Sequence, residues 1–185
     1  MDKKIKILGI VGSLRKGSFN MALMHYAKSI PLKDAEIEIA DISEIPIFNQ
    51  DLESQVPESV KNFKQKIKQS NAILISTPEY NYSIPGVLKN AIDWASRPYG
   101  DNSFDNKIVG IMSGSGGYIG GARAQYHLRQ IFVFLNMHPV NKPEVIVPMI
   151  HEKIDENGVL TDENTKKKIE ELVKTLINHT KKLTE

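Results

Sequence analysis

A loop near the start of the chain carries side chains that could bind a phosphate group. Its side-chain hydrogen-bond donors include Ser13, Arg15, Ser18 and Asn20, and an apolar run at helical period follows directly. The amino end of a helix attracts anions because its first N–H groups have no partner within the helix. The guanidinium can place two N–H groups on phosphate oxygens. These residues predict a phosphate site in this first loop, residues 12–20.

Two further loops carry residues suited to a flat aromatic ring. The second loop, residues 77–86, combines two prolines with Tyr80 and Tyr82. Proline restricts the backbone, and tyrosine offers an apolar face beside a polar tip. The third loop, residues 113–121, has five glycines among nine residues, which lets the backbone approach a ligand closely. One phosphate loop and two ring-binding loops predict an aromatic mononucleotide as the ligand.

The hydrophobic pattern predicts the elements that hold these loops. Short apolar β-branched runs favour strands, and apolar residues at three- and four-residue spacing favour helices. The expected strands are residues 4–11, 35–41, 72–77, 107–113 and 144–147, and the expected helices are residues 18–30, 56–69, 85–96, 120–136 and 162–183. Residues 42–57 are expected to form a loop, Thr161 to cap the last helix, and Asn157-Gly158 to be the tip of a hairpin.

This alternation predicts an α/β fold, a doubly wound five-stranded parallel sheet with helices on both faces. In such sheets ligands bind beyond the carboxyl ends of the strands. The three loops follow the first, third and fourth expected strands, so we expect them to meet at one site. No repeat or long linker divides the chain, which predicts a single domain over residues 1–185.

Composition narrows the classes of function. A net charge of +2 argues against a nucleic-acid binder that works by bulk positive charge. The absence of cysteine excludes a thiolate nucleophile or an iron–sulfur cluster, and no histidine pair has metal-ligand spacing, so we expect no metal site. The first residues do not resemble a signal peptide, and no apolar run approaches the roughly 20 residues of a membrane span. We therefore expect a cytoplasmic protein that inserts in no membrane.

Three other classes of protein that bind phosphate groups fit this chain less well. A nucleotide triphosphatase loop needs lysine after Gly17, where this chain has Ser18. A phospho-acceptor receiver domain needs acids at the ends of the first and third strands, where Gly12 and Thr77 stand. The glycine fingerprint of dinucleotide-binding domains is also missing.

The segments GSLRKGSFN, TPEYNYSIPGVLKNAIDWASRP and SGGYIGGARAQYHLRQ resemble the NADPH-dependent FMN reductase family. This flavodoxin-like group includes quinone, chromate and azo reductases, and the resemblance extends from the first strand through the fourth helix. It implies a flavodoxin-like FMN-binding domain that holds FMN noncovalently. The residues it implies for the phosphate are Ser13, Arg15, Ser18 and Asn20, with Phe19 in the same loop, and those for the isoalloxazine ring are Pro78, Glu79, Tyr80, Asn81, Ser113, Ser115 and Gly116.

The resemblance also implies an activity and an assembly. Electrons would pass from NADPH or NADH through FMN to a quinone or another small acceptor, such as an azo or nitro compound, chromate or free flavin. No side chain is expected to act as a catalytic acid or base, because the flavin carries the chemistry. The alternative is a flavodoxin-like electron carrier that acts through partner proteins, although such carriers are usually strongly acidic. Family members are usually homodimers or homotetramers, in which polar residues such as Arg123 and Tyr126 can serve assembly.

Overall fold

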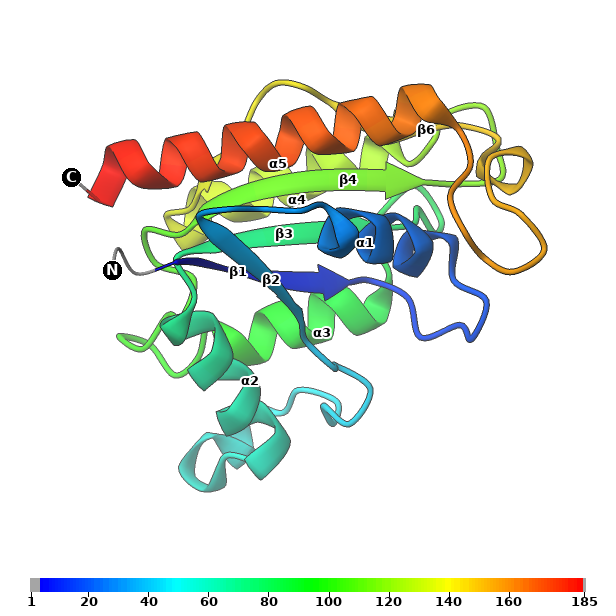
Figure 1. Cartoon of the computed structure of the whole chain (residues 1–185). Coiled ribbons are helices and arrows are strands. Elements are labelled where there is room, and N and C mark those ends of the chain that lie inside the picture. Colours follow the sequence, from blue (N-terminus) through cyan, green and yellow to red (C-terminus); the bar gives the residue numbers. More distant parts are fainter. Residues whose placement is uncertain (1–3, 185) are drawn as a thin grey trace.

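The computed structural model describes residues 4–184. The domain expected over residues 1–185 extends past this range, and its residues 1–3 and 185 lie outside the described part. Four strands form the main body of one parallel sheet, and they are β1 (Ile5–Val11), β2 (Ala35–Ile39), β3 (Ala72–Thr77) and β4 (Ile108–Gly114). Their order across the sheet is β2-β1-β3-β4. The arrowheads of β1 and β4 point to the same edge in Figure 1, as expected for parallel strands.

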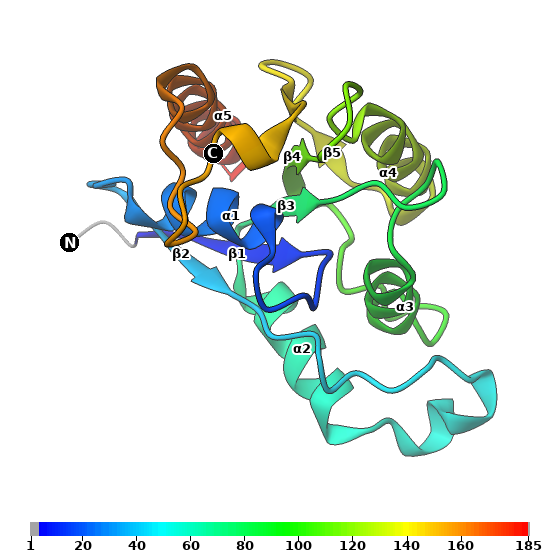
Figure 2. The ribbon, with the colours of Figure 1, turned by 90° about the vertical axis from the view of Figure 1, so that its right-hand side faces the viewer.

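Helices cover both faces of this sheet. They are α1 (Phe19–Ser29), α2 (Glu58–Gln69), α3 (Gly86–Ala95), α4 (Ala122–Leu135) and α5 (Glu163–Thr184). Figure 2 shows α1 and α5 on one side of the sheet and α3 and α4 on the other. The predicted doubly wound α/β architecture is therefore confirmed. No helix within residues 4–184 combines the length and the apolar character needed to cross a bilayer.

Alternating side chains of the central strands fill two separate cores. On β3, Ile73 and Ile75 pack among the residues of α2, α3 and α4, whereas Leu74 packs among those of α1 and α5. All of β3 is buried, because both of its faces are covered by helices. A strand buried on both sides favours apolar residues at successive positions, as at residues 72–75, which explains why its sequence shows no alternation of polar and apolar residues.

The last position in the sheet differs from the expectation of one continuous strand. Two short strands share it: β5 (His138–Pro139) pairs with the start of β4, and β6 (Val145–Val147) pairs with its end. The predicted strand at 144–147 corresponds to β6, but β5 was not predicted. A two-residue strand that contains proline has no apolar period and lacks one of its backbone donors.

Two smaller expectations were wrong. Residues 42–57 are not entirely loop, because Gln50–Gln55 form a 3₁₀ helix, η1, capped by the Asn49 side chain. The last helix is capped by Asp162 and not by Thr161: a carboxylate oxygen of Asp162 accepts hydrogen bonds from the backbone N–H and the hydroxyl of Thr165. The tight turn expected at Asn157-Gly158 is present, since Gly158 has a φ of 77° and an antiparallel bridge joins Ile154 to Leu160.

The connections diverge between β1 and β3, which are neighbours in the sheet. The chain leaves β1 towards α1 on one face and leaves β3 towards α3 on the other. This divergence opens a crevice at the carboxyl ends of the strands, where doubly wound proteins bind their ligands.

Candidate functional site

The three loops meet at this crevice around one cavity. Its volume is about 210 Å³. The lining residues come from the first loop (Ser13, Arg15, Ser18, Phe19, Asn20), the second loop (Pro78, Glu79, Tyr80) and the third loop (Gly114, Ser115, Gly116). Figure 2 looks onto this edge of the sheet, where the arrowheads of β1 and β3 face the viewer. The juxtaposition expected from the strand order is therefore present.

The first loop exposes unpaired backbone donors beside the amino end of α1. The Ser18 hydroxyl oxygen caps this helix by accepting a hydrogen bond from the N–H of Met21 at 3.3 Å. Within residues 4–184, the N–H groups of Lys16, Gly17 and Ser18 meet no acceptor. Together with the positive end of the helix dipole they form a cradle for an anion.

Arg15 places a positive charge at the rim of the same cradle. Its guanidinium carbon lies 4.6 Å from the centroid of the Phe19 ring, so the side chain folds back over the start of α1. The residue is exposed, and it lines the cavity together with Ser13 and Ser18. A guanidinium above an aromatic face keeps its edge free for hydrogen bonds to an anion.

Asn20 uses its side chain to join two loops. Its Nδ2 donates to the carbonyl of Gly114 at 2.9 Å, and its Oδ1 accepts from the N–H of Gly114 at 3.1 Å. The Ser76 hydroxyl donates to the backbone carbonyl of Asn20. The buried amide therefore ties the start of α1 to the ends of β3 and β4, and both of its polar atoms have partners in the protein.

The second loop turns back sharply on itself. Tyr80 and Ser83 exchange backbone hydrogen bonds of 3.0 and 2.9 Å, with two residues between them. Those two residues, Asn81 and Tyr82, have φ angles of 48° and 68°, which residues other than glycine rarely adopt. In the described part of the chain the N–H groups of Glu79 and Asn81 have no acceptor. The turn thus presents free backbone donors next to the exposed Tyr80 ring.

The third loop is held to the segment that follows β6. The N–H of Ser115 donates to the carbonyl of Val147 at 3.2 Å, and the N–H of Ile150 donates to the carbonyl of Ser115 at 3.1 Å. Two of the five glycines are required by geometry. Gly120 and Gly121 have φ angles of 63° and 89°, and a Cβ on Gly120 would lie 2.8 Å from the backbone nitrogen of Pro148.

Most of the predicted site residues come together, and two do not line the cavity. Asn81 lies at the exposed tip of the second turn. Ser113 is fully buried: its hydroxyl donates to the Gly120 carbonyl and accepts from Gln125. Gly114 lines the cavity but was not predicted, although it stands at the end of an apolar strand in a glycine-rich loop, and that position was a usable signal.

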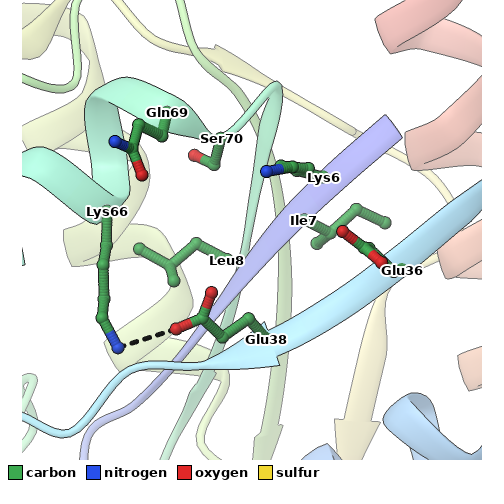
Figure 3. Close-up of a pocket in the computed structure, with 8 residues that line it drawn as sticks. All are labelled: Lys6, Ile7, Leu8, Glu36, Glu38, Lys66, Gln69 and Ser70. Atoms are coloured by element: carbon green, nitrogen blue, oxygen red, sulfur yellow. Dashed lines mark ion pairs between the residues drawn. The ribbon is translucent and has the colours of Figure 1, made fainter. Parts of the chain in front are cut away.

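Other features of the chain offer weaker sites. A hollow of about 60 Å³ lies beside β1 and the edge strand β2, and its lining holds two lysines and two glutamates. Figure 3 shows these residues, among which Lys66 pairs with Glu38 at 2.7 Å. The hollow lies away from the carboxyl ends of the strands. Within residues 4–184, no three histidine or acidic residues cluster in a way that could hold a metal ion.

A doubly wound sheet that carries an anion cradle beside a cavity for a flat ring defines the class of mononucleotide-binding α/β proteins. Within this class, the chain belongs to the NADPH-dependent FMN reductase family, whose model matches residues 5–152. The resemblance noted in the three loops is therefore confirmed.

Individual relatives extend over nearly the whole chain. An NAD(P)H-dependent FMN reductase of Pseudomonas aeruginosa is 46% identical over 177 residues, which cover 95% of each chain. An NAD(P)H:quinone oxidoreductase of Solanum tuberosum is 49% identical, with 89% of this chain and 87% of the relative covered. Among solved structures, the flavoenzyme FerB of Paracoccus denitrificans, an NAD(P)H:(acceptor) oxidoreductase, is 37% identical with a TM-score of 0.88, covering 96% of this chain and 98% of that one. These similarities confirm the flavodoxin-like fold.

Proposed function

We propose that the protein is an FMN-dependent oxidoreductase that passes electrons from NAD(P)H to quinones or other small acceptors. The observation that carries this proposal is the single cavity in which an anion cradle meets two loops suited to a flat ring. Relatives at 46% and 49% identity are named for these activities. In this proposal the described chain is one FMN-binding domain.

The residues of the cavity fit FMN. We expect Ser13, Arg15 and Ser18 to hold its phosphate, because they border the free N–H groups at the start of α1. Pro78, Tyr80 and the backbone of Glu79 would contact the ring, with Ser115 and Gly116 on its other side. For two of the predicted residues, Asn20 and Ser113, we expect no side-chain contact with FMN, because their polar side-chain atoms already bond to protein groups. These two residues would hold the loops in place.

The size of the cavity leaves part of the ligand accessible. A volume of about 210 Å³ is below the roughly 300–1,000 Å³ of a typical enclosed ligand pocket, so part of a mononucleotide must lie outside the walls. A second molecule can then reach the ring. The chemistry that bound FMN supplies is electron transfer between NAD(P)H and this second molecule. The chain's own contribution is to orient the ring and to stabilise negative charge on it through the N–H groups of Glu79 and Asn81.

An absorbance spectrum of the purified protein tests the proposal. We expect the two visible bands of oxidised flavin, either as isolated or after incubation with FMN and gel filtration. Anaerobic stopped-flow mixing with NADPH should then bleach these bands without any partner protein, and a quinone should restore them. A protein that takes up no FMN would contradict the proposal, and one that binds FMN but is not reduced by NADPH or NADH would favour the electron carrier.

We further propose that the protein forms a homodimer or homotetramer. The outward face of α4 supports this, because Tyr126, Gln130, Val133 and Phe134 are exposed and none is charged. Val133 and Phe134 are 82% and 78% exposed, which is unusual for large apolar side chains unless a partner covers them. Val133→Asp should lower the mass measured by light scattering. Val159→Asp places the same charge at an exposed valine of the hairpin and should leave the mass unchanged.

The cytoplasmic location expected from the sequence remains a prediction, and fractionation of cells that express the protein checks it.

A further inference from the structure

Helix α4 contacts the second loop through two residues one turn apart, Arg123 and His127. The Arg123 Nε donates to Oε1 of Glu79, and the Arg123 backbone N–H donates to Oε2 of the same carboxylate at 3.1 Å. The His127 Nδ1 lies 2.9 Å from the Ser83 hydroxyl oxygen. Since residues four apart lie on one side of a helix, α4 holds both ends of the tight turn at Asn81-Tyr82 from a single face.

Glu79 is committed to this contact. Its side chain is only 7% exposed, and both carboxylate oxygens accept hydrogen bonds from Arg123. A carboxylate withdrawn from water needs such partners, because an unpaired buried charge is strongly unfavourable. The carboxylate also lies at the first turn of α4, where a negative charge interacts favourably with the helix dipole. The side chain therefore anchors the loop, while the residue itself lines the cavity.

Arg123 also contacts a residue of the turn that has an unfavourable backbone conformation. Its guanidinium carbon lies 3.5 Å from the centroid of the Tyr82 ring, on the residue with a φ of 68°. A planar guanidinium can stack on an aromatic ring and donate from its edge at the same time, which lysine cannot do. The same side chain thus contacts Glu79 before the turn tip and Tyr82 within it.

We propose that Glu79 and Arg123 form a positioning clamp that fixes the backbone of residues 79–81 against the ring of the bound flavin. This inference rests on the proposed function. It assigns Arg123 a role within one chain, where the family resemblance suggested a role in assembly. Neither residue is a catalytic residue here, because the clamp acts on the cofactor through the backbone of the second loop.

The variants Glu79→Gln and Arg123→Lys test the clamp while leaving no unpaired buried acid. The amide oxygen of glutamine can still accept from the Arg123 N–H, and lysine keeps the positive charge beside Glu79. Each single variant should raise the dissociation constant for FMN by roughly tenfold and should change the visible circular dichroism of the bound flavin. The effects on affinity in the double variant should be less than additive, because both substitutions break the same unit.

Arg129→Lys is the matched control. Arg129 lies on the same helix but bonds to Asn141 and the Val140 carbonyl, away from the second loop. The FMN affinity and the visible spectrum of the Arg129→Lys variant should equal those of the wild type. Unchanged FMN affinity and dichroism in both Glu79→Gln and Arg123→Lys would overturn the clamp and leave the proposed function intact, even if their melting temperatures fell. A wild-type protein that takes up no FMN would overturn the proposed function and the clamp with it.

Discussion

Asn20 and Gly114 are 94 positions apart in the sequence and are joined by two hydrogen bonds between the Asn20 amide and the Gly114 backbone. The Asn20 side chain satisfies both the N–H and the carbonyl of Gly114 at the point where β4 ends. One buried amide thus connects the loop with the anion cradle to the glycine-rich loop across the cavity.

Asn20→Ala should destabilise the fold. The substitution leaves the N–H and carbonyl of Gly114 buried without partners, and a loss of about 2–3 kcal/mol in the free energy of unfolding is expected. Urea denaturation measures this loss. The exposed Asn178 on α5 provides a control, because its replacement by alanine should change the free energy of unfolding by less than about 0.5 kcal/mol. Equal stabilities of the two variants would contradict a structural role for the Asn20 bridge.

Arg15→Ala should weaken FMN binding while leaving the fold intact, because Arg15 is exposed. A lost charge-assisted hydrogen bond of about 1.5–3 kcal/mol corresponds to a dissociation constant raised roughly ten- to hundredfold. Quenching of flavin fluorescence on titration measures this constant. Lys16→Ala removes a neighbouring positive charge that does not line the cavity, and its effect should not exceed about fivefold. If the Arg15 variant bound FMN as tightly as the Lys16 variant, Arg15 would not hold the phosphate.

Gly120→Ala should strongly destabilise the fold, and Gly86→Ala should not. At Gly120 the new Cβ would lie 2.8 Å from the Pro148 nitrogen, at a φ of 63°. The strain alone predicts a loss of roughly 1–3 kcal/mol. At Gly86, in the first turn of α3, the new Cβ meets nothing within 4 Å, so a gain of about 0.4–1 kcal/mol is expected. Thermal unfolding of both variants measures these effects, and a stable Gly120 variant would show that the third loop can relax.

Asp162→Ala should cost stability in a pH-dependent way. The hydrogen bond from the Thr165 hydroxyl, followed by that from its backbone N–H, holds the pKa of the Asp162 carboxyl below its ordinary value of 3.8. A carboxyl group with a depressed pKa stabilises the fold above its unfolded-state pKa, and this contribution is lost as the pH falls through the folded-state pKa. The variant should therefore be about 1 kcal/mol less stable than the wild type at neutral pH.

This difference should shrink below pH 3.8, and denaturation at several pH values follows it. Thr161→Ala serves as the control, because the Thr161 hydroxyl donates only to the Lys153 carbonyl and does not cap α5. A larger loss of stability at Thr161 than at Asp162 would restore the original prediction of the cap.

The central strands were predictable because they bury continuous apolar runs. Residues 72–77 are apolar or small throughout, and they form β3 with the expected bounds. The pair β5 and β6 was not predictable as two strands. Their pairing depends on the free edge of β4, a tertiary property, and His138-Pro139 carries no local signal. The cap of α5 was misassigned because threonine and aspartate are both good caps in adjacent positions.

The residue types predicted which loops form the site better than they predicted where each side chain points. Ser13, Arg15 and Ser18 line the cavity beside the start of α1, because a strand–loop–helix connection has little freedom. Ser113 and Asn20 have the same polar character, yet their side chains bond to Gly120 and Gly114. Those partners are distant in sequence or depend on left-handed glycines, so no local pattern could reveal them. The contact between Glu79 and Arg123 spans 44 positions in the sequence, so no local pattern could predict it either.

The backbone bonds from Ser115 to Val147 and from Ile150 to Ser115 have one further consequence. Contacts within the protein determine the conformation of the glycine-rich loop, and a bound ligand is not needed for it. Apoprotein and holoprotein should then superimpose closely at residues 113–121, and cofactor uptake should carry only a small entropic penalty from ordering the chain. The glycines of this loop would then allow a rigid backbone conformation beside the ligand, and the loop would not move as a flexible flap.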